Sequence, residues 1–287
     1  MDRPDIPLNA LRTFEVAARQ GSFTRAAVEL RVTQAAISHQ IARLEDLLGV
    51  TLFTRSSAGL ILSEEGRALF PVLERGFDAM GQALDRIDGR RHVTVIRVGV
   101  VSTFALGWLM PRLDRFRASY PHVDLRLFTN NNRVEIAREG LDMAIRFGTG
   151  RWPEHEAVQL MAAPISPLCA PALAASLRGP EDLAGQTLLR SYRADEWALW
   201  CAAAGVTCPP LDGPVFDSSL AIADLAAQGQ GIALLPVAMF QRQIAAGQLV
   251  QPFPVLLPVG GYWLTWPAGR ALDSAMEDFR AWLQHEV

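Results

Sequence analysis

The 287-residue sequence predicts an α/β protein with an N-terminal winged helix-turn-helix, a long linker helix and a two-lobed C-terminal domain. Two short helical patterns joined by a tight turn occupy residues 21–45. An apolar seam at heptad spacing follows at residues 70–87, and from residue 95 onward apolar runs alternate with helical patterns. We therefore expect domains at 1–63 and 64–88, a hinge at 89–94, and a C-terminal domain at 95–287.

The helix-turn-helix pattern covers GSFTRAAVELRVTQAAISHQIARLE, residues 21–45. Thr24 occupies an N-cap position for the first helix, and Thr33 offers an N-cap for the second. The second helix places Ile37 and Ile41 on one face, which leaves polar side chains on the face that enters the major groove in such units. Spacing alone favours an ordinary amphipathic hairpin, so the prediction depends on the flanking segments.

Segments on both sides complete a DNA-binding unit. Apolar residues at helical spacing over 8–17 predict a preceding helix. Two β-prone runs, 51–53 and 60–62, with turn residues between them predict a wing that carries Arg55. Residues of the second helix should read bases of double-stranded DNA, and arginines and threonines around it should hold phosphates. The full predicted set is Thr24, Arg25, Thr33, Gln34, Ser38, His39, Arg43 and Arg55.

The net charge of the chain is not what predicts DNA binding. The formal net charge of the chain is −3, and residues 1–60 contain seven arginines and six acidic residues, a balance of +1. A nonspecific coat on nucleic acid is therefore disfavoured, and binding has to depend on where the arginines point.

A regular apolar seam follows the DNA-binding unit. Its members alternate at spacings of three and four, an a/d pattern over nearly three heptads: Phe70, Leu73, Phe77, Met80, Leu84 and Ile87. A core helix of a globular domain shows the same pattern, but a seam this regular between two domains favours dimerisation. A two-fold dimer would place two recognition helices about 34 Å apart on successive major-groove faces.

From residue 95 the alternation of strands and helices predicts a parallel sheet with helical crossovers. The first lobe should contain strands at 96–101, 123–128 and 142–147 and helices at 105–121 and 135–140. The chain crosses into a second α/β lobe near residues 161–167 and returns for a last helix at 271–283. We expect the first lobe at 95–163 and 267–287 and the second at 164–266.

Polar residues follow several predicted strands, at the edge where α/β folds bind ligands. Ser102-Thr103-Phe104 follow the first strand, Thr129 to Arg133 follow the second, and Arg146 closes the third. In the second lobe Ser218 and Ser219 precede a helix, and Tyr262 lies on a late strand. Thr103 could simply cap its helix, which is common. Together these groups predict a cleft for an amphiphilic, partly anionic small molecule.

No cofactor, metal site or membrane contact is expected. The three cysteines, Cys169, Cys201 and Cys208, are widely spaced, without a CxxC or a histidine at ligand spacing. The N-terminal residues lack the apolar segment of a signal peptide, and no apolar run approaches a membrane span. We therefore expect a cytoplasmic protein.

The motifs of residues 1–66 resemble the DNA-binding module of LysR-type transcriptional regulators. FEVAA, GSFTRAA, VTQAAISHQIARLE, LFTR and LSEEG follow one another without a gap, and GQGIALLPV at 229–237 resembles another segment of that family. The resemblance implies a periplasmic-binding-protein-like effector domain. It also implies a homodimer or homotetramer that bends promoter DNA and changes the access of RNA polymerase.

Within the family the chain resembles regulators of inducible chromosomal β-lactamase, through TFA at 103–105, LLRSYRADEWALW at 188–200, VFDSS at 215–219 and GYW at 261–263. This implies a sensor that anhydro-muropeptides activate and that the UDP-linked murein precursor holds as a repressor. Ser102 and Glu135 replace the glycine and aspartate usual in this group, at positions that alter induction. The expected effector set is Ser102, Thr103, Phe104, Asn131, Asn132, Glu135, Arg146, Ser218, Ser219 and Tyr262.

Three other classes remain as alternatives. An enzyme is disfavoured because the chain has no G-x-S-x-G, H-E-x-x-H, P-loop or dinucleotide-binding glycine pattern, and its five histidines do not cluster. A solute-binding protein would share the distal fold but carry a signal peptide and no DNA-binding unit. A LysR-type regulator of amino-acid metabolism, resembling the glycine-cleavage activator, shares much of the framework.

Overall fold

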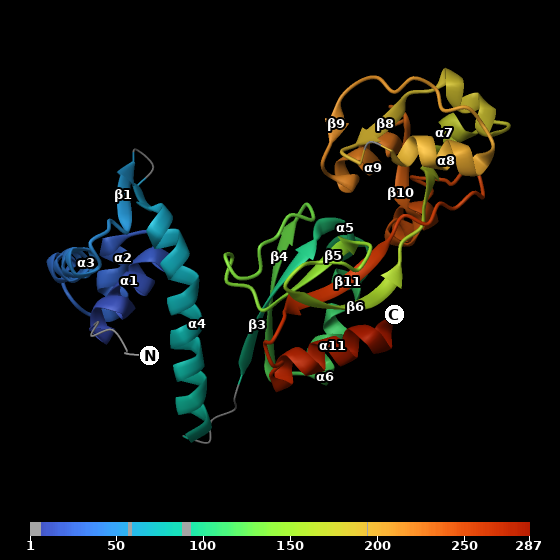
Figure 1. Ribbon diagram of the computed structural model, residues 1–287. Coiled ribbons are helices and arrows are strands. Elements are labelled where there is room, and N and C mark those ends of the chain that lie inside the picture. The colour runs from blue at the N-terminus through green and yellow to red at the C-terminus, as the bar shows by residue number, and fades with distance from the viewer. Residues whose placement is uncertain (1–6, 57–58, 88–92, 194) are drawn as a thin grey trace. The chain divides into compact units, whose positions relative to one another are not determined.

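The computed structural model describes residues 7–56, 59–87, 93–193 and 195–287. The predicted fold class is confirmed: a winged helix-turn-helix, a long helix and a two-lobed α/β domain follow one another (Figure 1). The chain divides into two units, residues 1–94 with 138–140, and residues 95–137 with 141–287. Most of the predicted hinge, 89–94, lies outside the described residues, although Thr94 already begins strand β3. None of the described helices has the length and apolarity needed to cross a lipid bilayer.

Three helices enclose the core of the N-terminal unit: α1 (Leu8–Gln20), α2 (Phe23–Leu30) and α3 (Gln34–Leu48). The wing is an antiparallel pair of β1 (Phe53–Ser56) and β2 (Gly59–Leu62). The first wing strand was predicted at 51–53, but it begins at Phe53, because the backbone N–H groups of Leu52 and Phe53 donate to Glu45 Oε1. This carboxylate ties the end of α3 to the start of the wing.

The turn between α2 and α3 depends on two caps and one unusual backbone angle. The predicted N-cap at Thr24 is wrong: Ser22 caps α2, and its Oγ accepts a hydrogen bond from Arg25 N at 3.4 Å. Thr33 caps α3 as predicted, because its Oγ1 accepts from Ala36 N at 3.2 Å. Arg31 ends α2 with a φ of 55°, in the left-handed region that turns the chain.

The linker helix α4 runs from Glu64 to Ile87. Phe70 and Leu73 of the predicted seam are partly buried against the core of the N-terminal unit, so their own chain already covers part of these side chains. Further along, Met80 and Leu84 are 42% and 66% exposed. The exposed part of the seam therefore lies in the C-terminal half of the helix. The side chain of Ile87 is not among those that the structure describes.

A five-stranded sheet forms the first lobe, in the order β4-β3-β5-β11-β6. Its strands are β3 (Thr94–Val101), β4 (Val123–Asn130), β5 (Met143–Gly148), β6 (His155–Ala162) and β11 (Gly261–Pro267). Two helices, α6 (Leu113–Ser119) and α11 (Ser274–Glu286), lie side by side against it (Figure 1), where the rings of Phe116 and Phe279 are 5.4 Å apart.

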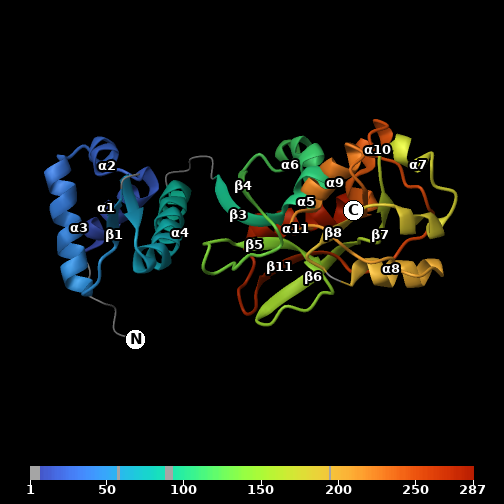
Figure 2. The ribbon, with the colours of Figure 1, turned by 90° about the horizontal axis from the view of Figure 1, so that it is seen from above.

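The second lobe contains a four-stranded sheet in the order β7-β10-β8-β9. Its strands are β7 (Ile165–Leu168), β8 (Leu188–Ser191), β9 (Val215–Phe216) and β10 (Ile232–Pro236). Successive residues of β8 and β10 enter two different buried clusters, one with α8 (Glu196–Ala204) and one with α9 (Ser219–Ala227). The two helices therefore cover opposite faces of this sheet, as Figure 2 shows.

The lobes of the C-terminal unit share one hydrophobic core. Phe104 and Trp108 of the first lobe belong to the same buried cluster as Met239 and Ile222 of the second. Gly107 allows this close approach, since a Cβ atom there would collide with the carbonyl oxygen of Met239. A shared core limits how far the lobes can separate without exposing apolar surface.

Three expectations about the C-terminal unit need correction. Pairing is parallel between β3 and β5 and between β8 and β10. However, β11 runs antiparallel to β5 and β6, and β7 runs antiparallel to β10, so both sheets are mixed. Because β11 pairs in the first sheet from Gly261, the lobe boundary predicted at 266/267 is wrong and Tyr262 belongs to the first lobe. The helix predicted at 135–140 is absent, and residues 136–140 form turns.

Candidate functional site

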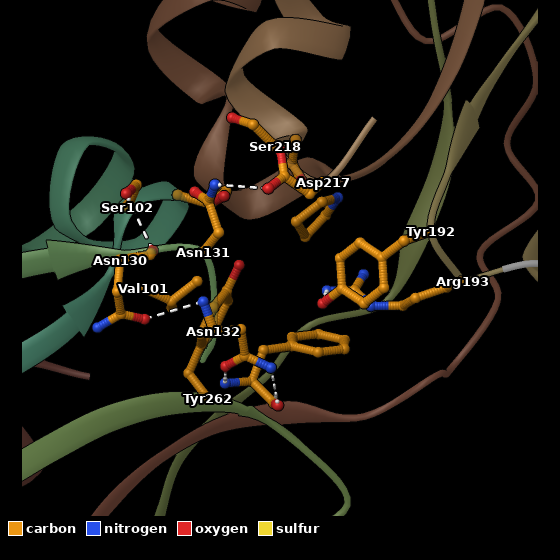
Figure 3. Close-up of a pocket in the computed structure, with 14 residues that line it drawn as sticks. Val101, Ser102, Asn130, Asn131, Asn132, Tyr192, Arg193, Asp217, Ser218 and Tyr262 are labelled. Carbon is orange, nitrogen blue, oxygen red and sulfur yellow. Dashed lines mark hydrogen bonds between the residues drawn. The ribbon is translucent and has the colours of Figure 1, made fainter. Parts of the chain in front are cut away.

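A pocket lies between the two lobes of the C-terminal unit (Figure 3). The ends of β3, β4 and β5 and the start of β11 form one wall, and residues after β8 and before α9 form the other. The pocket brings together seven of the ten predicted effector residues, namely Ser102, Thr103, Asn131, Asn132, Ser218, Ser219 and Tyr262. The polar residues at these strand ends thus lie together around one pocket, and their role in binding a ligand stays a prediction.

The other three predicted residues do not line this pocket. Arg146 is buried beside Trp152, with its guanidinium carbon 5.8 Å from the ring centroid, whereas its neighbour Phe147 lines the pocket. This follows from the alternation of side chains along β5. Phe104 is fully buried behind Tyr262, with ring centroids 4.9 Å apart. Glu135 is exposed, five residues beyond the end of β4.

Sequence reasoning missed three large side chains of the pocket. Phe147 is apolar and gave no signal, although it lies directly opposite Tyr262 in the β5–β11 register. Tyr192 and Arg193 follow the last residue of β8. The rule that found Ser102 and Asn131, that polar residues after strands line the cleft, would have found this pair too.

The hydroxyl groups of the pocket fall into two classes. Ser102 Oγ donates to the carbonyl oxygen of Asn130 at 3.0 Å, and Ser218 Oγ caps α9 by accepting from Ala221 N. Within the described part of the chain, the hydroxyls of Thr103, Ser219 and Tyr262 have no hydrogen-bond partner. These three groups are therefore available to a bound ligand.

Tyr262 is held rigidly and stays neutral. Its ring is 1% exposed and contacts Phe104 and Phe147 at centroid distances of 4.9 and 5.6 Å. Burial raises the pKa of Tyr262 well above its ordinary value, and the nearby charge of Arg193 only partly offsets this rise. The phenol consequently keeps its proton and can both donate and accept a hydrogen bond.

Asn132 shapes the floor of the pocket. Its backbone has a φ of 66°, which asparagine tolerates better than most residues. Its side-chain amide donates to the carbonyl oxygen of Phe147 at 2.8 Å and accepts from Phe147 N at 2.7 Å (Figure 3). The loop after β4 is thereby fixed to the end of β5, which orients the Phe147 ring.

Two contacts cross from one lobe to the other beside the pocket. Asn131 Nδ2 donates to Asp217 Oδ2 at 3.1 Å (Figure 3), and the Arg193 guanidinium carbon lies 4.3 Å from the centroid of the Phe147 ring. The pocket thus has a cation and a carboxylate on its second-lobe wall and amides and hydroxyls on the first.

The predicted DNA-binding residues lie on α2, α3 and the wing of the N-terminal unit. Ile37, Ile41 and Leu44 of α3 are buried, which turns the opposite face of this helix outward. Gln34, His39 and Arg43 are exposed there, and Ser38 is half-exposed. On α2, Thr24 and Arg25 are exposed, and an Arg25 N–H donates to the Gln20 carbonyl. Thr33 is exposed while it caps α3, and the side chain of Arg55 lies outside the description.

A winged helix-turn-helix followed by an α/β domain with a polar pocket between its lobes defines a ligand-responsive DNA-binding regulator. Residues 8–67 match the sequence family described as "Bacterial regulatory helix-turn-helix protein, lysR family", and residues 89–287 match the LysR substrate binding domain. The chain belongs to the LysR family.

Several known proteins are similar over nearly the whole chain. The sequence is 65% identical over 283 residues to the HTH-type transcriptional activator AmpR of Rhodobacter capsulatus. The aligned residues cover 99% of this chain and 98% of that protein. It is 47% identical over 281 residues to the carbapenem-hydrolyzing beta-lactamase transcriptional activator of Serratia marcescens, covering 97% and 96%. The effector domain of the transcriptional regulator AmpR of Pseudomonas aeruginosa matches 68% of this chain and 95% of its own, with a TM-score of 0.65 and 52% identity.

Proposed function

We propose that the chain controls transcription of a β-lactamase gene and that a murein-derived peptide bound in the interlobe pocket sets its activity. The observation that carries the proposal is that Thr103, Ser219 and Tyr262, whose hydroxyls have no partner among the described residues, line one pocket. The similarity to a β-lactamase transcriptional activator over the whole chain supports the target gene.

The chemistry of the pocket suits a peptide. Amide and hydroxyl groups from Thr103, Asn131, Ser219 and Tyr262 can donate to and accept from peptide bonds and carboxylates. The Phe147 ring adds an apolar element to the lining, between Tyr262 and Arg193. On this proposal anhydro-muropeptides and the UDP-linked murein precursor occupy the same pocket and stabilise different conformers, since only a difference in affinity between two states can switch a protein.

On this proposal the protein acts on transcription by binding promoter DNA. Gln34, Ser38 and His39 read base edges in the major groove, and phosphates are held by residues such as Thr24 and Arg43 around the outward face of α3. Arg25, Thr33 and Arg55 belong to the same surface on this proposal. Homodimers form through the exposed part of α4 and pair into a tetramer that acts in the cytoplasm. A change in subunit arrangement then alters the DNA bend and the access of RNA polymerase.

Transcription in vitro from the promoter of the linked β-lactamase gene tests this function. Purified protein with RNA polymerase should repress in the presence of UDP-MurNAc-pentapeptide and activate when an anhydro-muramyl peptide replaces it. A Gln34→Ala variant should repress and activate this promoter less, because its affinity for the operator falls by about 1–3 kcal/mol. Binding to that promoter with no response to either peptide, in a folded protein, would assign the chain a different effector.

A further inference from the structure

We propose that Arg193 determines effector specificity by binding a carboxylate of the ligand. This inference rests on the proposed function, because it names the chemical group that the same pocket recognises. Arg193 lines the pocket directly after β8, on the second-lobe wall (Figure 3).

The guanidinium is held in place from three sides. Its Nη1 donates to Glu196 Oε1 at 3.0 Å, and its Nη2 donates to the Tyr192 hydroxyl at 3.4 Å. Its carbon lies 4.3 Å from the centroid of the Phe147 ring. Glu196 is itself fixed, because its second oxygen accepts from Ser191 Oγ at 2.9 Å. A ligand carboxylate therefore meets a preorganised cation and does not have to order a flexible side chain.

The charge of Arg193 survives its surroundings. Burial is the largest single influence and lowers the pKa of Arg193, but the Glu196 carboxylate and the Tyr192 hydroxyl together outweigh it, so the pKa is raised. A guanidinium has five N–H groups, and the two described hydrogen bonds leave others to form the paired contact that a carboxylate accepts. The Phe147 ring covers one face of the guanidinium, so an anion approaches along its edge.

The rest of the pocket favours a singly charged group over a pyrophosphate. Among the described lining residues Arg193 is the sole cation, and Asp217 lies on the same lobe wall. A doubly charged pyrophosphate would meet one positive and one negative side chain. A carboxylate at Arg193 does not occupy Asp217, whose Oδ2 accepts from Asn131 Nδ2 and whose other oxygen can accept N–H or O–H groups from the remainder of the ligand.

A purely structural role for the Arg193–Glu196 ion pair would lead to a different result. If Arg193 only fastened the start of α8 to β8, its replacement would lower stability and affect all ligands equally. A specificity role predicts a loss of affinity that depends on the charge of the ligand. Arg190 provides a matched control, because it lies on β8, donates to the Gly213 carbonyl oxygen at 3.0 Å and does not line the pocket.

The test is calorimetry on the full-length protein with two probes, UDP-MurNAc-pentapeptide and the same compound with its peptide carboxyl groups amidated. We expect the wild type to bind the acid at least tenfold more tightly than the amide. Arg193→Met should lose this preference, Arg193→Lys should keep part of it, and Arg190→Met should keep all of it.

Equal binding of acid and amide by the wild type would overturn the role of Arg193 while leaving the proposed function intact, and this comparison needs no variant. The same holds if Arg193→Met weakens both probes equally. Binding of neither probe by the wild type would overturn the proposed function together with this inference.

Discussion

Asn131 Nδ2 donates a hydrogen bond of 3.1 Å to Asp217 Oδ2, and this bond joins the loop after β4 to the residues that precede α9. It connects the two lobes at an exposed position beside the pocket. Because the lobes also share a continuous buried core, we expect ligand binding to involve small displacements around the pocket and no wide separation of the lobes.

Asp217→Ala should loosen this connection. An exposed hydrogen bond to a carboxylate stabilises by about 1 kcal/mol, so local opening should become roughly fivefold more frequent. Hydrogen exchange at the amide of Asn132, which donates to Asn130 Oδ1 within this loop, reports how often the loop after β4 opens. Asp212→Ala, an exposed aspartate of the same lobe that does not line the pocket, should leave the exchange rate unchanged. An unchanged exchange rate in both variants would show that the Asn131–Asp217 hydrogen bond does not help to hold the two lobes together.

Asn132→Ala should lower the free energy of unfolding of the C-terminal domain by about 2–4 kcal/mol. It removes both hydrogen bonds to the Phe147 backbone and leaves alanine at a φ of 66°. Asn132→Gly tolerates that angle and should lose about 1 kcal/mol less. All seven tryptophans lie beyond residue 95, so tryptophan fluorescence in urea reports on this domain. Asn131→Ala is the control and should cost under about 1 kcal/mol.

Gln34→Ala should cost about 1–3 kcal/mol at one base pair of the operator and relax specificity there. Arg43→Ala should instead weaken all DNA sequences alike and reduce the salt dependence of binding by about one ion. Both side chains are exposed on α3. Fluorescence anisotropy with operator and random duplexes at several salt concentrations separates the two effects. If Gln34→Ala weakened random DNA as much as operator, it would be a phosphate contact.

Cys169→Ala should change how stability depends on pH. Cys169 is fully buried, and burial raises the pKa of its thiol from 9.0 to about 11. Above pH 9 the unfolded chain loses this proton while the folded chain keeps it. The free energy of unfolding therefore falls as pH rises from 9 to 11, by up to about 1.4 kcal/mol per pH unit.

The variant should show a shallower fall over that range in urea unfolding. Loss of packing lowers its stability at every pH and does not alter the slope. Cys201, whose thiol pKa burial raises to about 12, keeps some dependence in both proteins. An identical slope in wild type and variant would show that Cys169 ionises as readily in the folded state as in the unfolded one.

Local signals in the sequence explain much of the fold. Thr33 was recognisable as a cap because a threonine preceding an amphipathic run accepts hydrogen bonds from the first helical turn. The failure at Thr24 has the same origin, since Ser22 two residues earlier offers an equivalent hydroxyl and the helix begins at Phe23. Periodicity shows that a helix is present more reliably than it shows at which residue the helix begins.

The pocket was predictable only in part because its walls depend on distant pairing. Ser102 and Asn131 follow strands and carry polar side chains, so the strand-end rule finds them. Phe147 and not Arg146 reaches the pocket because alternate side chains of β5 point to opposite faces of the sheet. The pairing register with β11 places Phe147 opposite Tyr262. That register joins residues more than a hundred positions apart in sequence, and β11 enters the first sheet only after the chain has built the second lobe.

The most direct test of the central claim is calorimetric binding of UDP-MurNAc-pentapeptide and an anhydro-muramyl peptide to the full-length protein. Thr103→Val and Tyr262→Phe should each weaken binding by about tenfold, because each removes one hydroxyl that faces the pocket. Thr207→Val, an exposed threonine away from the pocket, should bind as the wild type does. Binding of neither peptide by a folded protein that still binds operator DNA would contradict the claim that this pocket senses murein.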